Sequence, residues 1–196
     1  MKEILNFTTN FIRLDIFVGF GFYSILYFVL KAFLKDKKTI EELDKSAVQL
    51  IIFLGFVWLA FWFIGALAFY FGLEDETIKA EYYERFTGKY AFALWIQPMF
   101  WFLLTQAYRI RFIRKHLIPR IIISLLFVVT IERFTLIVTT LHRDYLPSSW
   151  ASNNEFGMDM KYPIVGLLGK ILVFLAVVCL YHFGVKKIKN ALYQRH

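Results

Sequence analysis

The chain has 196 residues, of which 59% are hydrophobic and 20% aromatic, and this apolar content indicates a helical membrane protein rather than a soluble domain. Its formal net charge of +8 does not indicate nucleic-acid binding, because the basic residues gather in the connections between apolar segments. The single cysteine, Cys179, excludes an internal disulfide framework and a cysteine-ligated iron–sulfur cluster.

Five apolar segments are each close to the roughly 20 residues that cross the hydrocarbon core of a bilayer. In chain order they are residues 11–34, 47–71, 90–108, 118–141 and 163–182. The sequence outside them leaves no room for a separate soluble domain. We therefore predict an all-α integral membrane protein, a single domain of residues 1–196 with five transmembrane helices in one bundle.

The charges of the connections predict the orientation of these helices. The connections after the first and third segments and the C-terminal tail are basic, with Lys31, Lys35, Lys37, Lys38 and Lys45, then Arg109, Arg111, Arg114, Lys115 and Arg120, then Lys186, Lys187, Lys189 and Arg195. The other two connections are acidic or poor in basic residues. The positive-inside rule then places the N-terminus outside and the C-terminus in the cytoplasm.

The first segment carries Arg13 and Asp15 near its outer end, followed by Gly19 and Gly21. The two glycines lack a phosphate-loop context, so we expect them to allow close contact between helices. In the second segment Trp58 and Trp62 are four residues apart and should pack on one face. The connection between these segments ends in Glu41, Glu42, Asp44 and Lys45, which we expect to form a solvated helical turn.

The third segment contains Gln97 and Pro98 within its apolar run. Proline removes a backbone donor and displaces the carbonyl four residues earlier, that of Leu94, so a kink is expected. One interpretation is that the freed carbonyl and Gln97 hold water or a ligand. The alternative is a structural kink in which Gln97 bonds to a neighbouring helix.

The fourth segment carries Glu132 and Arg133 roughly midway along its length. A charge at that depth costs about 2.5–3.5 kcal/mol on insertion scales, so such residues usually face a protein interior and serve a function. Threonines at helical spacing continue from Glu132 towards His142, and Asp144 follows. These groups form a plausible hydrogen-bonded proton route from the middle of the membrane to its outer surface.

The ionisable residues within the segments lie from the middle of the membrane outward: Arg13, Asp15, Glu132, Arg133 and Lys170. The inner half is expected to hold only hydroxyls and amides, such as Ser124, Thr105 and Gln106. Three roles remain open for the charges: structural ion pairs that fix helix register, a proton- or quinone-linked function, or another transport function. The sequence shows no Ser–His–Asp arrangement and no metal-ligand spacing.

Two stretches resemble one family of membrane subunits. They are residues 131–150, IERFTLIVTTLHRDYLPSSW, and residues 95–101, WIQPMFW, which run into a basic connection. Both resemble NrfD/PsrC-type subunits, most closely those of bacterial alternative complex III, over residues 90–185. Members of that family have eight to ten spans in two bundles, and this chain resembles the C-terminal bundle only.

The resemblance implies a multi-pass subunit of the bacterial inner membrane within a quinol-linked respiratory complex. It implies other membrane subunits and a periplasmic iron–sulfur or haem subunit as partners, with menaquinone as the cofactor of the complex rather than of this chain alone. Glu132, Arg133, His142 and Asp144 would belong to its polar path, and Gln97, Pro98 and Trp101 to a quinone or helix-kink contact. The chain would be at most a membrane subunit of a quinol oxidoreductase, not an enzyme by itself. The alternatives are a non-catalytic scaffold or assembly subunit and a small ion-coupled transport component.

Overall fold

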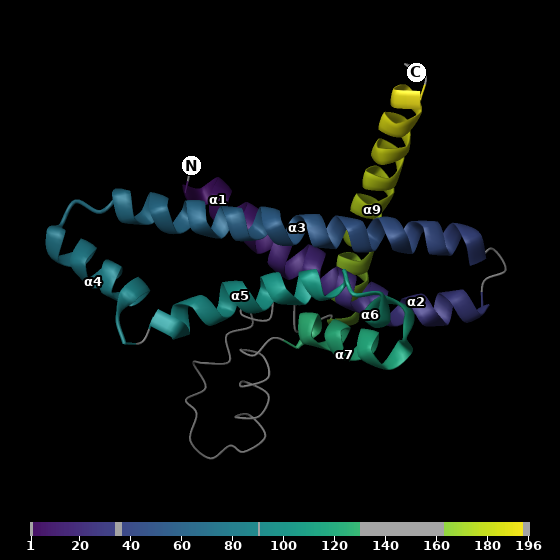
Figure 1. Ribbon diagram of the computed structural model, residues 1–196, viewed down its shortest axis with the longest axis horizontal. Coiled ribbons are helices and arrows are strands. Elements are labelled where there is room, and N and C mark those ends of the chain that lie inside the picture. The colour runs from purple at the N-terminus through teal and green to yellow at the C-terminus, as the bar shows by residue number, and fades with distance from the viewer. Residues whose placement is uncertain (1, 34–36, 90, 130–162, 194–196) are drawn as a thin grey trace, which may run out of the picture.

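The computed structural model describes residues 2–33, 37–89, 91–129 and 163–193, and in them every regular element is a helix (Figure 1). The elements are α1 (Lys2–Asn10), the π-helix η1 (Phe11–Phe17), α2 (Val18–Phe33), α3 (Lys37–Phe71), α4 (Glu76–Thr87), α5 (Ala91–Ala107), α6 (Arg111–Lys115), α7 (Leu117–Val128) and α9 (Pro163–Tyr193). The predicted residues Glu132, Arg133, His142 and Asp144 lie outside the described ranges. The all-helical fold class is confirmed.

Three of the helices are long and apolar enough to cross a membrane, over Glu3–Phe33, Lys38–Phe71 and Gly166–Ile188. They coincide with the first, second and fifth predicted segments. In the third segment α5 has 17 residues, and in the fourth α7 has 12 before the description stops. The 35 residues of α3 extend over about 52 Å at 1.5 Å per residue.

The helices pack around α2 and α3 (Figure 1). α3 lies along α5, and α4 connects these two helices at one end of the molecule. α7 packs against α2, and α9 crosses α2 and α3 steeply, so that its last turns project beyond them. α2 therefore contacts a different neighbour on each side, which places strict demands on the size of its side chains.

Gly19 and Gly21 meet that demand, and the prediction of close helix contact is confirmed. A Cβ atom on Gly19 would lie 2.6 Å from the backbone oxygen of Lys170 and 2.9 Å from Cβ of Phe174, both on α9. A Cβ atom on Gly21 would lie 2.9 Å from the backbone oxygen of Ser124 on α7. Backbone atoms cannot rotate away as a side chain can, so these two glycines set the spacing of three helices.

The core between these helices is aromatic. Phe20 lies edge-on to Tyr108, Phe127 and Phe174, at ring-centroid distances of 4.8, 5.7 and 5.6 Å. Trp58 packs 6.4 Å from Phe17, and Trp62 packs 5.5 Å from Trp95. The expected packing role of the two tryptophans is confirmed, and edge-to-face geometry of this kind adds specificity to apolar burial.

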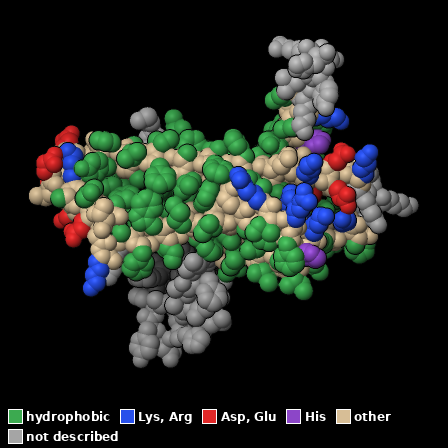
Figure 2. Space-filling model, in the orientation of Figure 1, with side chains coloured by type: hydrophobic (Ala, Val, Ile, Leu, Met, Phe, Trp, Pro, Cys, Tyr) green, Lys and Arg blue, Asp and Glu red, His purple; other side chains and the backbone are tan. Residues whose placement is uncertain are grey.

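Charged side chains gather toward the two ends of the molecule, and the surface between them is mostly hydrophobic (Figure 2). Acidic residues surround the turn from α3 to α4, where Asp75 caps α4 by accepting a hydrogen bond from the Thr77 backbone N–H at 2.8 Å. The hydrogen bonds from Thr77 lower the pKa of Asp75. At the opposite end, basic residues gather where α2 meets α3 and where α6 lies. The orientation of the helices across a bilayer stays a prediction from the positive-inside rule.

Candidate functional site

The most completely formed polar site is centred on Arg120, in the first turn of α7, whose side chain is fully buried. Its Nη1 and Nη2 atoms donate to the two carboxylate oxygens of Asp44 on α3, at 3.0 and 2.5 Å. Its Nε atom donates to Oγ of Ser24 on α2 at 2.7 Å. The planar guanidinium thus makes a two-pronged pair with Asp44 and a third bond to another helix, which is the geometry for which arginine is suited.

The guanidinium of Arg120 also contacts a backbone oxygen and two aromatic rings. Nη1 also donates to the backbone oxygen of Arg114 on α6 at 3.3 Å. The central carbon lies 4.3 Å from the centroid of the Tyr27 ring and 5.5 Å from that of Phe28, both on α2. A desolvated cation over an aromatic face gains about 2 kcal/mol or more. Arg120 therefore connects α2, α3, α6 and α7 at one point.

A chain of hydroxyl groups continues from Arg120 into the core. The Tyr108 hydroxyl lies 2.8 Å from Oγ of Ser124 and 3.4 Å from Oγ of Ser24, which receives the Nε bond from Arg120. Oγ of Ser124 donates to the backbone oxygen of Arg120 at 2.7 Å. All three hydroxyl residues are fully buried, so their mutual bonds satisfy groups that would otherwise be costly to bury.

This network corrects two expectations. The region around Ser124, where only hydroxyls and amides are expected, also holds a buried ion pair, and Asp44 is buried rather than part of a solvated turn. The sequence carries a signal for Asp44, because Ala47, Val48 and Ile51 follow at spacings of three and four and are buried on the same face. The apolar face of α3 therefore begins one turn earlier than the apolar run itself.

A second ion pair joins α9 to the π-helical turn. Lys170 donates from Nζ to Oδ1 of Asp15 at 2.9 Å and to the backbone oxygen of Leu14 at 2.8 Å. The lysine is 6% exposed. Single π-helical turns inside α-helices are frequent at functional sites. The structure thus brings together two of the five ionisable residues that the sequence placed in one layer.

The other predicted site residues fall into three groups. Arg13 is half-buried and makes no ion pair with another described residue. Pro98 is buried inside α5, which continues through it, and Gln97 is half-buried. Trp101 is 2% exposed and stacks on Phe17 at 5.5 Å, so its surface is used by the aromatic core.

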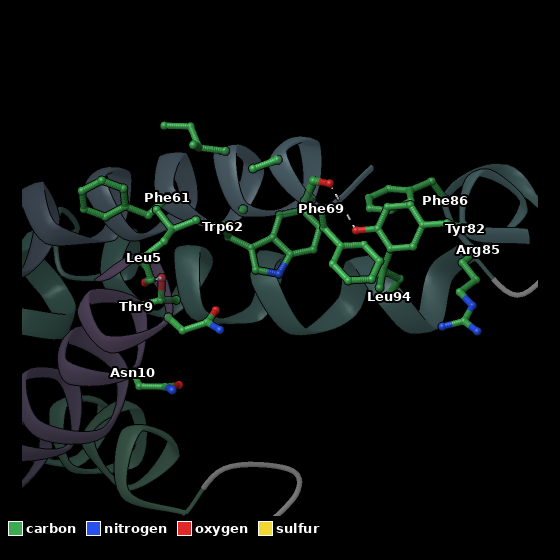
Figure 3. Close-up of a pocket in the computed structure, with 15 residues that line it drawn as sticks. Leu5, Thr9, Asn10, Phe61, Trp62, Phe69, Tyr82, Arg85, Phe86 and Leu94 are labelled. Atoms are coloured by element: carbon green, nitrogen blue, oxygen red, sulfur yellow. Dashed lines mark hydrogen bonds between the residues drawn. The ribbon is translucent and has the colours of Figure 1, made fainter. Parts of the chain in front are cut away.

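An apolar cavity of about 450 Å³ lies between α1, α3, α4 and α5, at the end of the molecule opposite Arg120 (Figure 3). Its walls include Phe61, Trp62 and Phe86, and Arg85 is the cationic member of its lining. The Tyr82 hydroxyl donates to the backbone oxygen of Ala66 at 3.4 Å. Burial raises the pKa of Tyr82 above its ordinary value. The cavity suits a ligand with a flat or apolar body.

No group of three or more His, Cys, Asp or Glu side chains with the geometry to hold a metal ion occurs in the described part of the chain. No protein-family model, curated protein or solved structure matches the sequence or the fold. The function of the chain is therefore inferred from the two ion pairs and the apolar cavity.

Proposed function

We propose that this chain is a multi-pass subunit of a bacterial inner-membrane complex of the quinol-linked electron-transfer type, and that it supplies a helical framework rather than a redox centre. The observation that carries the framework role is the buried Arg120 guanidinium, each of whose three nitrogens donates a hydrogen bond, to groups on three other helices. The quinol-linked setting rests on the resemblance of residues 95–101 and 131–150.

The chemistry of the pair supports a structural role. Arginine stays protonated at any physiological pH, so Arg120 cannot relay protons. The two-pronged bond holds the Asp44 carboxylate in one orientation, and the Tyr23 hydroxyl donates to its Oδ1 at 3.4 Å. Buried pairs of this kind are weak sources of net stability, and fixing register is their best-attested use. Here the pair fixes where α3 and α7 lie against α2.

This proposal is tested by purifying the tagged full chain from its own membranes in mild detergent. We expect other membrane chains and an iron–sulfur or haem subunit to co-purify. Replacing Asp44 with Asn should lower the yield of the assembled complex several-fold, while quinol oxidation per assembled complex stays within about twofold of the unmodified protein. A chain that purifies alone from membranes in which the electron carriers remain intact would refute the proposal.

A second candidate function is the predicted proton path with a quinol contact. It is supported by the ion pair of Lys170 with Asp15, whose side chain is 36% exposed, because the sequence predicts both residues in one polar layer. The apolar cavity toward the acidic end of the molecule supplies a place for a quinone ring. In this reading Glu132 is the central proton carrier and Asp15 lies near the outer exit.

Glu132→Gln separates the two candidates, because glutamine keeps the size of the side chain and cannot carry the proton. If the path operates, quinol oxidation or its coupled proton movement should fall about 10-fold or more, as expected for loss of a proton-transfer group, while assembly is retained. Glu84→Gln, an exposed position on α4, serves as the matched control and should leave turnover unchanged. Unaltered turnover and coupling in assembled Glu132→Gln complex would exclude the path.

A further inference from the structure

A second cavity, of about 630 Å³, opens at the basic end of the molecule between α2, α3 and α6. Its lining contains five basic side chains, Lys31, Lys45, Arg111, Arg114 and Lys115. Figure 2 shows a cluster of basic side chains at this end, where Figure 1 places α6 and the junction of α2 and α3. Five of the basic residues in the described ranges thus surround one hollow.

The two acidic residues of the lining are already matched by cations. Glu41 pairs with Lys31 at 2.8 Å, and Asp44 pairs with Arg120, which lies behind the cavity wall. Lys45, Arg111, Arg114 and Lys115 form no ion pair with any other residue in the described ranges. The cavity therefore keeps an excess of positive charge that an anionic ligand would neutralise.

The other part of the wall is aromatic and apolar, formed by Tyr27, Phe28 and Val48. Arg120 holds the two sides of the cavity in place, because it bonds to the carboxylate of Asp44 on α3 and to the backbone oxygen of Arg114 on α6. The basic groups thus stand on a fixed frame, which lowers the entropic cost of binding a ligand between them.

We propose that this cavity binds the phosphate headgroup of an anionic phospholipid, with its glycerol and first acyl carbons against the aromatic edge formed by Tyr27 and Phe28. Basic pockets between membrane helices on the cytoplasmic side bind anionic headgroups, and the predicted orientation places this end of the molecule there. Arginine also offers paired donors that match phosphate oxygens. A free phosphate would use the same cations, but it would leave the apolar wall unused.

The test uses the purified full chain in detergent and native mass spectrometry with phosphatidylglycerol or phosphatidylcholine of identical acyl chains. The double variant Arg111→Gln/Lys115→Gln removes two cations from the cavity. Lys186→Gln/Lys187→Gln removes the same charge from exposed positions on α9 and is the matched control. Each basic residue near an anionic headgroup contributes about 1 kcal/mol of attraction. Affinity for phosphatidylglycerol should therefore fall about 10-fold to 30-fold in the cavity variant, and less than about twofold in the control.

Each alternative outcome overturns the proposal. Equal losses in both variants would mean general charge attraction, and equal binding of phosphatidylcholine would mean that the headgroup charge is not recognised. Inorganic phosphate at constant ionic strength, added in a thermal-shift assay, should not reproduce the stabilisation by phosphatidylglycerol, and a matching shift would identify a free anion as the ligand. If the double variant does not fold, Lys45→Gln at an exposed position on α3 replaces it and should weaken binding about fivefold.

Discussion

Replacing Arg120 with methionine should destabilise the fold by roughly 3–5 kcal/mol, the cost expected when one partner of a buried ion pair is removed. Methionine retains most of the apolar volume of arginine. The loss of stability therefore measures the contribution of the charge and its hydrogen bonds. The Asp44 carboxylate would remain buried with the weak 3.4 Å bond from the Tyr23 hydroxyl. The measurement is equilibrium unfolding of the purified chain in mixed micelles, followed by circular dichroism or tryptophan fluorescence.

The double variant Arg120→Met/Asp44→Leu identifies the origin of this loss. Because it removes both charges, it should recover at least half of the stability that Arg120→Met loses, as buried pairs replaced by apolar residues do elsewhere. Lys31→Met breaks the exposed pair with Glu41, whose side chains are 39% and 56% exposed, and should change stability little. A double variant as unstable as the single one would show that packing of the arginine stem, not charge, holds the four helices together.

Replacing Gly19 with alanine should destabilise the fold by about 1–3 kcal/mol, the usual cost of overpacking. The added methyl group would meet the Lys170 backbone oxygen and Cβ of Phe174, so α9 must move away from α2. Gly21→Ala should act in the same way through the Ser124 backbone oxygen on α7. The same unfolding experiment, together with hydrogen exchange of the α9 amides, measures the effect.

At Gly184, replacement with alanine should not lower the stability of the fold, because an added Cβ atom would meet nothing within 4 Å. Alanine is favoured over glycine within a helix by about 1 kcal/mol, so Gly184→Ala should be neutral or stabilising. The contrast between the two glycines separates helix propensity from helix contact. A Gly19→Ala protein as stable as the unmodified chain would mean that the helices tolerate a wider spacing.

The sequence located the long helices because the length of an apolar run is a local property. The predicted segments 11–34, 47–71 and 163–182 coincide, to within a few residues at their ends, with helices that are long enough to cross a membrane. Their ends were less well predicted. α3 begins at Lys37 and α9 continues to Tyr193, because lysine, together with glutamate in α3 and with alanine and leucine in α9, is a good helix former and extends a helix into polar surroundings.

The pairing of charges was harder to predict, because it joins residues that are distant in the chain. Asp15 and Lys170 were placed in one layer from depth alone, yet their contact spans 155 positions. The sequence suggests a basic connection for Arg120 because it stands close to other cations, and a solvated turn for Asp44 because it stands among charged residues of both signs. Helical spacing was the better guide, since Arg120, Ser124 and Phe127 fall on one buried face of α7.

The length of α3 has a consequence for the surrounding lipid. Residues 48–71 are free of charge, and this stretch alone extends for about 36 Å against a hydrocarbon thickness of about 30 Å. A helix of that reach must lean away from the membrane normal or gather thicker lipid around itself, at a cost of fractions of a kcal/mol per Å of mismatch. The thickness of the surrounding bilayer would thus influence the tilt of α3 and, with it, the tilt of the helices that pack against α3.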